Sequence, residues 1–194
     1  MSDNRTKWDS RYSSSQALPG GSPCWILQTH QDKLAGHGSA LDIACGLGDN
    51  AVFLAQHGYQ TYAYDISAVA IKKLTTYAAK YSLPVTAQVY DLESQPLASN
   101  AFDIVCVSHF LQRNLFSDII NSLKPGGLIF YQTFVKTDAS VNGPKNPEFL
   151  LESGELRQAF RNLNIIAYYE DNKGLYYPST PYGNQAALLA RKPD

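Results

Sequence analysis

A glycine turn preceded by an aspartate is the part of this sequence whose residue types could best hold a polar small molecule. The turn is "CGLGDN" at residues 45–50, in which Gly46 and Gly48 allow positive φ and a close approach of the backbone to a ligand. Three aspartates stand near the ends of three consecutive predicted strands: Asp42, Asp65 and Asp91. A carboxylate accepts hydrogen bonds from two hydroxyl or amino donors, so this arrangement is typical of a nucleoside-binding site.

Alternating strands and helices are predicted to position these residues. Strands are predicted at 39–45, 59–66, 85–93, 102–110, 128–134, 165–171 and 185–192. Helices are predicted at 49–58, 67–83, 113–123 and 152–163, with Ser67 as an N-cap and Gly58 as a C-terminal cap. The pattern predicts one α/β domain over residues 1–194: a doubly wound, Rossmann-like, mainly parallel seven-stranded sheet with helices on both faces. The last two strands, with no evident helix between them, predict an antiparallel C-terminal hairpin.

Composition excludes several classes of protein. No apolar run approaches the length of a membrane span, and the polar start "MSDNRTKWDSRY" contains no visible signal peptide. A net charge of −1 offers no electrostatic case for nucleic acid or an anionic membrane as the main partner. Three scattered cysteines form no CxxC pair, which predicts reduced thiols, a cytoplasmic location and no metal site: Cys24, Cys45 and Cys106.

The glycine turn alone does not identify its ligand, because Gly46 to Ala51 also matches the dinucleotide fingerprint GxGxxA. Asp65 follows Gly46 by 19 residues, the spacing of an acid that binds ribose hydroxyls in both NAD and S-adenosylmethionine proteins. Asp42 stands where dinucleotide folds usually have an apolar residue, and an acid at Asp91 can accept from an adenine amino group. Three aspartates after three consecutive strands therefore favour S-adenosylmethionine.

These motifs resemble the class I S-adenosylmethionine-dependent methyltransferases, because "LDIACGLGDN", "AYDIS", "VYDLE", "FDIV" and "KPGG" follow in that family's order. More narrowly, "KWDSRY", "LDIACGLGDNAVFLAQHGY" and "AYDISAVAI" resemble the small bacterial tellurite-resistance-type methyltransferases. The resemblance implies S-adenosyl-L-methionine as cofactor and S-adenosyl-L-homocysteine as product. It implies the methionine part at Ala44 to Gly48, ribose at Asp65 and adenine beside Asp91. Ala44 stands where the family usually has its first glycine, which costs little unless its φ is positive.

Residues 1–30 are predicted to cover the cofactor, because Trp8 and Tyr12 are similar to a Trp-x-x-x-aromatic segment that does so in the tellurite-type enzymes. The alternative is a surface helix with one packed aromatic residue. Asp42 is expected to order the turn and to reach the cofactor's amino group through water, and Asp49 to cap the first helix. The remaining predicted cofactor-binding residues lie in or beside the same motifs: Arg11, Cys45, Asn50, Ile66, Leu92 and Ser108.

His109 is the predicted catalytic residue, as a base or a substrate contact, because the segment "SHFLQR" faces the transferring methyl group in this family. An imidazole accepts a proton near neutral pH. The alternative is a structural histidine in a pocket wall. The predicted substrate-binding residues are Phe110, Arg113 and Tyr177, and Pro-, Gly- and Tyr-rich loops within 136–184 are candidate substrate lids.

The sequence thus predicts methyl transfer by in-line displacement to a small-molecule acceptor. The segment after the fourth strand contains "SHFL" instead of the Asn/Asp-Pro-Pro-aromatic motif of DNA and many amino-group methyltransferases, which favours a small-molecule substrate and leaves a protein or RNA substrate open. Two alternatives stay open: an NAD(P)-dependent oxidoreductase, and a non-catalytic S-adenosylmethionine-binding module that acts through a partner. The sequence predicts neither the identity of the acceptor nor the oligomeric state.

Overall fold

The computed structural model describes residues 2–136, 143–171 and 180–194, and the chain divides into two compact units, Met1–Leu97 and Ala98–Asp194. The strand order is β3-β2-β1 in the first unit and β4-β5-β7-β6 in the second. These are the seven strands of the predicted α/β sheet, mainly parallel with antiparallel strands at the C-terminal end. The prediction of one domain over the whole chain stays a prediction.

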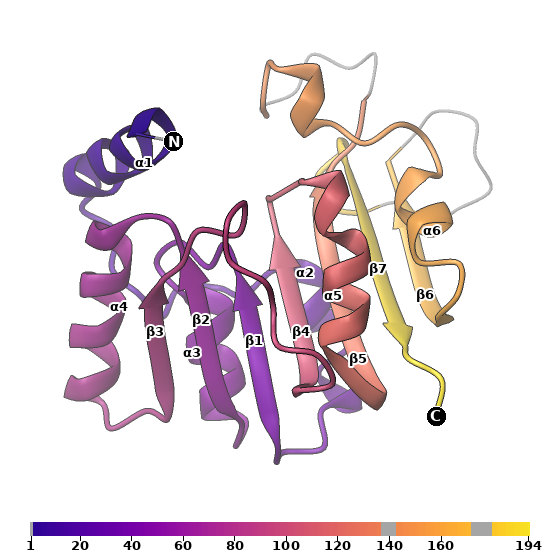
Figure 1. Ribbon diagram of the computed structural model, residues 1–194, viewed down its shortest axis with the longest axis horizontal. Helices are drawn as coiled ribbons and strands as arrows, with labels where there is room; N and C mark the ends of the chain where they lie inside the picture. Colours follow the sequence, from indigo (N-terminus) through magenta and orange to yellow (C-terminus); the bar gives the residue numbers. More distant parts are fainter. Residues whose placement is uncertain (1, 137–142, 172–179) are drawn as a thin grey trace. The chain divides into compact units, whose positions relative to one another are not determined.

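The first unit consists of three parallel strands with helices between them (Figure 1). Its strands are β1 (Ser39–Ile43), β2 (Gln60–Asp65) and β3 (Val85–Val89). Its helices are α1 (Ser2–Ser14), α2 (Trp25–Thr29), the 3-10 turn η1 (Gln31–Lys33), α3 (Asp49–Gln56) and α4 (Ala68–Lys80). Both predicted caps are confirmed. Ser67 Oγ accepts from Ala70 N at 3.2 Å, and Gly58 has a φ of +89° after α3.

α3 and α4 pack against these strands through small and branched residues, which in α4 recur at helical spacing: Ala70, Ile71, Leu74 and Ala78. Val52 of α3 and Leu74 of α4 bury their side chains together with Ala63 of β2. Leu74 also fixes the identity of Gly48, since a Cβ there would lie 2.5 Å from Leu74 Cδ2. The side chain of Leu74 in α4 thus packs directly against Gly48 of the glycine turn.

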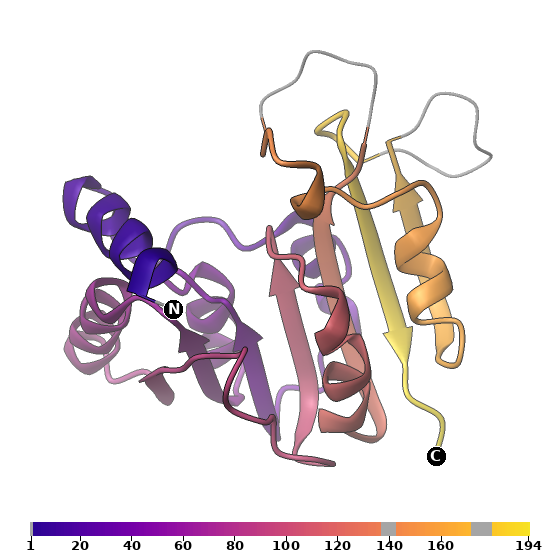
Figure 2. The ribbon, with the colours of Figure 1, turned by 45° about the horizontal axis from the view of Figure 1, so that its top comes forward.

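α1 is held against α4 by hydrogen bonds at two points, and Figure 2 shows the two helices side by side in the first unit. Asp9 Oδ1 accepts from Ser67 Oγ at 2.6 Å and from Val69 N at 3.2 Å, at the start of α4. Lys73 Nζ donates to the carbonyl oxygens of Tyr12 and Ser15, each at 2.8 Å, at the end of α1. α1 is therefore a docked element of the unit.

The second unit contains the antiparallel strands (Figure 1). Its strands are β4 (Phe102–Ser108), β5 (Leu123–Phe134), β6 (Asn164–Glu170) and β7 (Gln185–Arg191). Its helical segments are η2 (Arg113–Leu115), α5 (Phe116–Ser122), η3 (Pro147–Phe149) and α6 (Glu155–Ala159). β5 pairs with β4 in parallel and with β7 in antiparallel, and β6 pairs with β7, so the predicted C-terminal hairpin is confirmed.

Two predicted helices differ most from the structure. The helix predicted at 113–123 divides into η2 and α5, and "KPGG" lies inside β5, where Gly126 has a φ of +73°. The helix predicted at 152–163 is limited to α6, because Gly154 at its N-cap has a φ of +72°. Among the helices of the described residues, none is long and apolar enough to cross a membrane.

Candidate functional site

The turn after β1 is a run of left-handed backbone. Ala44, Gly46 and Gly48 have φ values of +51°, +54° and +83°. The positive φ at Ala44 means that alanine does carry a conformational cost at the position where the related enzymes usually have glycine. The turn closes with a hydrogen bond from Gly48 N to Cys45 O at 2.8 Å, and α3 starts directly after it.

Asp65, the last residue of β2, holds this turn in place. Its Oδ2 accepts from Gly46 N and its Oδ1 from Ser67 N, each at 2.8 Å, and the residue is buried. Burial raises the pKa of Asp65, and the two backbone hydrogen bonds oppose that rise. A carboxylate is an acceptor that suits the paired hydroxyl groups of a ribose.

Asp42 performs the ordering role that the sequence predicts for it. Its Oδ2 accepts from Ala51 N at 3.1 Å and its Oδ1 from Asn50 Nδ2 at 3.3 Å, so it satisfies a backbone donor in the first turn of α3. The residue is fully buried, and desolvation raises the pKa of Asp42 to about 7. Contact between Asp42 and a cofactor amino group stays a prediction.

Asp49 and Asn50 tether the chain that precedes β1. Asp49 Oδ1 accepts from Gly21 N at 2.9 Å, and Asn50 Oδ1 accepts from Cys24 N at 2.8 Å. The predicted capping role of Asp49 is wrong, because Gly48 is the N-cap of α3 and no side-chain cap bond is made there. Sequence reasoning missed this tether because its partners are 28 and 26 residues away. Cofactor binding by Asn50 stays untested.

Tyr12 of α1 lies over the glycine turn. A Cβ on Gly46 would be 2.6 Å from the Tyr12 hydroxyl oxygen, so the glycine leaves room for this tyrosine. Burial, and then the nearby charge of Asp65, raises the pKa of Tyr12. Trp8 stacks on Tyr12 with ring centroids 5.8 Å apart, and the Arg11 guanidinium lies 5.1 Å from the centre of the Trp8 ring. The segment predicted to cover the cofactor therefore adjoins the predicted cofactor turn.

The third aspartate lies farther along a loop than the sequence predicts. β3 ends at Val89, and Asp91 is half-buried in the following loop, where its Oδ1 accepts from Glu93 N at 3.0 Å. Leu92 and Ile66 are also half-buried, each directly after a predicted acid. The structure thus places Asp91 after β3 and Asp65 at the end of β2, as the motif order requires, and the adenine contact stays untested.

In the second unit, His109 follows β4 directly and has a φ of +53°, an unusual value for a residue with a side chain. Its backbone N–H donates to Gln132 O at 2.9 Å, and its partly buried ring lies 5.1 Å from the ring of Phe134 between centroids. Its Nε2 is 3.3 Å from Gln185 Nε2. Partial burial lowers the pKa of His109, so the neutral ring is favoured at neutral pH.

The predicted substrate residues have different surroundings. Arg113 is held in a clamp, with Nε donating to Glu155 Oε1 at 2.6 Å and further bonds to the carbonyl oxygens of Glu148 and Leu150. Glu155 raises the pKa of Arg113, and this clamp gives the guanidinium a structural role that the sequence did not reveal. Phe110 is half-buried and its carbonyl accepts from Tyr131 Oη at 3.0 Å, whereas Tyr177 lies outside the described residues.

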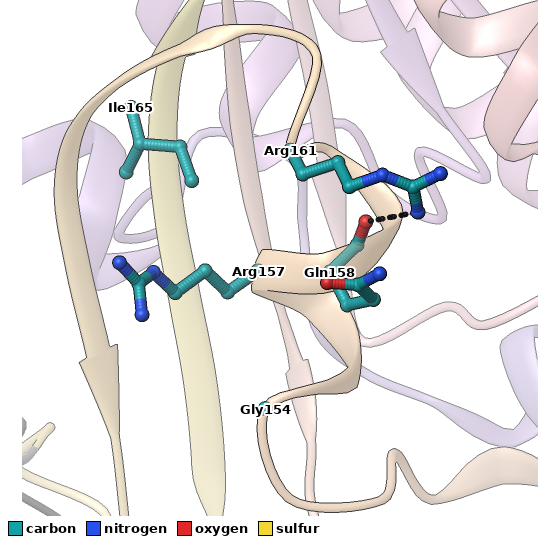
Figure 3. A pocket seen from close by; sticks show the side chains of 5 residues that line it. All are labelled: Gly154, Arg157, Gln158, Arg161 and Ile165. Atoms are coloured by element: carbon teal, nitrogen blue, oxygen red, sulfur yellow. Dashed lines mark hydrogen bonds between the residues drawn. The ribbon is translucent and has the colours of Figure 1, made fainter.

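A separate hollow on the second unit involves none of these residues. Figure 3 shows its lining, in which the two guanidinium groups point in different directions: Gly154, Arg157, Gln158, Arg161 and Ile165. Among the described parts of the chain, no group of three or more His, Cys, Asp or Glu side chains could hold a metal ion. The candidate site is therefore the glycine turn with its carboxylates, together with His109 as a separate candidate in the second unit.

The turn's chemistry fits an S-adenosylmethionine cofactor. The glycines at positive φ expose backbone, Asp65 offers acceptors suited to ribose, and Tyr12 lies over the turn. Residues 40–127 match the family model described as a methyltransferase domain. The chain thus resembles the class I S-adenosylmethionine-dependent methyltransferases in domain match and in fold, and this prediction is confirmed.

Two individual proteins are similar to this chain in sequence. The chain is 30% identical over 167 residues to hemagglutinin 1 of Eikenella corrodens, covering 79% of this chain and 54% of that protein. It is 28% identical over 163 residues to TehB of Haemophilus influenzae, described as a probable S-adenosyl-L-methionine-dependent methyltransferase, covering 78% of this chain and 56% of that protein. The chain therefore spans about half the length of both relatives.

Solved structures share the fold. The crystal structure of TehB from Haemophilus influenzae matches with a TM-score of 0.72 at 20% identity, over 97% of this chain and 66% of that chain. The geranyl diphosphate C-methyltransferase from Streptomyces coelicolor A3(2) matches with a TM-score of 0.70 at 14% identity, over 98% of this chain and 97% of that chain. TehB is thus similar to this chain both in sequence and in fold.

Proposed function

We propose that this chain is an S-adenosylmethionine-dependent methyltransferase that acts on a small molecule. The observation that carries the proposal is the turn after β1, where left-handed backbone, the Asp65 carboxylate and the Tyr12 hydroxyl meet at Gly46. The description of TehB as a probable enzyme of this class supports it. So does the geranyl diphosphate C-methyltransferase structure, which contains S-adenosyl-L-homocysteine.

In this proposal the first unit binds and orients the cofactor, which when bound supplies a methyl group on a positively charged sulfonium. Ala44 to Gly48 bind the methionine end through exposed backbone, with Cys45 in the same turn. Asp65 accepts from the ribose hydroxyls, and Asp91 from the adenine amino group. Trp8, Arg11 and Tyr12 cover the cofactor and limit access of water, which favours a displacement in which positioning supplies most of the rate increase.

The second unit contributes the acceptor contact in this proposal. His109 is its main residue, because the residue is partly open to solvent, the ring is held by neighbours at the end of β4, and its lowered pKa favours the neutral form. Ser108 and Phe110 flank it in sequence. The near-zero net charge and the absence of a recognised nucleic-acid methyltransferase motif after β4 favour a small-molecule acceptor.

Calorimetric titration of the purified chain with S-adenosylhomocysteine, S-adenosylmethionine and NADH in parallel tests the class. We expect the first two to bind with one site each and NADH not to bind. Binding of NADH alone would instead support the oxidoreductase alternative. A second step, transfer of a labelled methyl group to panels of thiols, hydroxyls, amines and oxyanions, separates an enzyme from a non-catalytic binding module, since the module binds the cofactor and methylates none of them.

A further inference from the structure

Two buried glutamines control the environment of the His109 ring. Gln185, the first residue of β7, is 4% exposed, and Gln132 of β5 is 0% exposed. Gln132 Nε2 donates to Gln185 Oε1 at 2.5 Å, and Gln185 Nε2 lies 3.3 Å from His109 Nε2. The two amides and the imidazole therefore form one hydrogen-bond network that ends at the partly exposed ring.

The donors and acceptors of this hydrogen-bond network follow one order, and that order decides which nitrogen of the imidazole carries the proton. The carbonyl oxygen of Gln185 already accepts from Gln132, so the group that Gln185 presents to His109 is its amide nitrogen, which only donates. His109 Nε2 must then accept, and a neutral imidazole whose Nε2 accepts carries its proton on Nδ1. Protonation of Nε2 would place two donors, Gln185 Nε2 and His109 Nε2, against each other at 3.3 Å.

The backbone on both sides keeps this geometry in place. Asp171 Oδ2 accepts from Gln185 N at 3.1 Å, and its Oδ1 accepts from Thr180 N at 2.7 Å, so the start of β7 is anchored. The ring itself packs on Phe134, and the His109 N–H is bonded to the backbone of β5. The described side chains of Gln185 and Phe134 contact the His109 ring, and neither of them titrates. Asp171 accepts a hydrogen bond from the backbone N–H of Gln185 and not from its side-chain amide.

We propose that Gln185 is a positioning residue that fixes the proton of neutral His109 on Nδ1, so that His109 serves the methyl acceptor as a hydrogen-bond donor and not as its base. The part of this proposal that concerns the acceptor rests on the proposed function. A donor at this place selects acceptor molecules that carry a lone-pair group, such as a carbonyl or carboxylate oxygen, beside the atom to be methylated.

Nitrogen NMR of the imidazole rings tests the proton assignment without cofactor or acceptor. The chain has four histidines, and the His109→Asn variant identifies the signals of His109 by their loss. In the wild type we expect the neutral His109 ring to be protonated on Nδ1. In Gln185→Glu the new carboxylate accepts from Nε2–H, so the proton moves to Nε2 and the pKa of His109 rises by about one unit or more.

Gln158→Glu is the matched control, because it makes the same change at an exposed glutamine on α6. It should move neither the proton nor the pKa of His109. A wild-type ring protonated on Nε2, or a folded Gln185→Glu variant with an unchanged ring, would overturn the proposal. Failure of the proposed function would appear elsewhere, as absent binding of S-adenosylhomocysteine, so the two failures are distinguishable.

Discussion

Two residues stand directly after parallel strands with almost the same unusual backbone: Ala44 after β1, with a φ of +51°, and His109 after β4, with a φ of +53°. A residue with a Cβ loses roughly 1–2 kcal/mol in this conformation relative to its usual one. At His109 the strain presents an aromatic ring to solvent and to Gln185. At Ala44 the side chain is a methyl group that gains nothing comparable, so the strain there follows from the turn.

The surroundings of the two turns differ in charge as well. The β1 turn is held by Asp42 and Asp65, buried carboxylates that accept from backbone donors. The β4 turn is held by the neutral amides of Gln132 and Gln185. Charge near the β1 turn suits binding of a polar cofactor, whereas neutral amides at the β4 turn keep a histidine uncharged and oriented. Backbone strain of equal size therefore accompanies a proposed cofactor-binding turn after β1 and an oriented histidine after β4.

The largest expected effect is on the pH dependence of the free energy of unfolding, and it comes from Asp42 beside the β1 turn. Its folded pKa of about 7 lies above the value of about 3.9 for an unfolded chain, so the folded state holds the extra proton between these values. The contribution of Asp42 to stability is therefore complete below about pH 4 and is lost as pH rises to 7. The loss is up to about 1.4 kcal/mol per pH unit, roughly 4 kcal/mol in all.

Asp42→Asn should remove most of this slope, as urea unfolding at pH 5, 6 and 7 would measure. Asp32→Asn is the control, because Asp32 is an exposed aspartate outside the site. An Asp42→Asn protein whose unfolding free energy falls with pH as steeply as that of the wild type would mean that the slope does not come from Asp42. The carboxylate of Asp42 would then be ionised in the folded protein between pH 5 and 7, and the contrast in charge with the neutral amides of the β4 turn would be sharper.

The next largest effect is expected for Asp65→Ala, measured as affinity for S-adenosylhomocysteine by calorimetry. The variant loses the acceptor for Gly46 N and the proposed acceptor for the ribose. Charge-assisted hydrogen bonds contribute about 1.5–3 kcal/mol, so affinity should fall roughly 10- to 150-fold. Asp32→Ala again serves as the control. A folded Asp65→Ala protein with wild-type affinity would remove Asp65 from the cofactor site.

A smaller effect is expected at the other turn, where two replacements of His109 separate its possible roles. His109→Ala removes the ring, while His109→Asn places an amide donor close to where Nδ1 stands and also tolerates positive φ. With an acceptor found in the transfer panel, alanine should lower kcat/KM about tenfold, and asparagine should restore most of the loss. A general base would give equal, much larger losses in both variants, roughly 100-fold or more.

The sequence predicted those parts of the molecule whose signals are local. Strand periodicity, the Ser67 cap and the glycines of the β1 turn each depend on neighbouring residues, and the structure confirms all three. The side-chain roles that were missed are long-range. Arg113 bonds Glu155 from 42 residues away, so no local pattern shows that its guanidinium is already held. The positive φ of Ala44 was equally hidden, because alanine is a residue type that argues against it.

Ala44→Gly is the smallest and most direct test of the comparison. Glycine removes the cost of positive φ, roughly 1–2 kcal/mol, but it also makes the unfolded chain more flexible, which takes back about 0.5–1 kcal/mol. The net expectation is a gain of roughly 0.5–1 kcal/mol in unfolding free energy by urea titration, with affinity for S-adenosylhomocysteine unchanged. His109→Gly is the matched variant at the β4 turn: it relieves the same strain, but it loses the contacts with Phe134 and Gln185 and should gain no stability. Equal gains at both positions would show that the His109 ring contributes nothing to the fold, and the β4 turn would then be strained solely for what the ring does with a bound molecule.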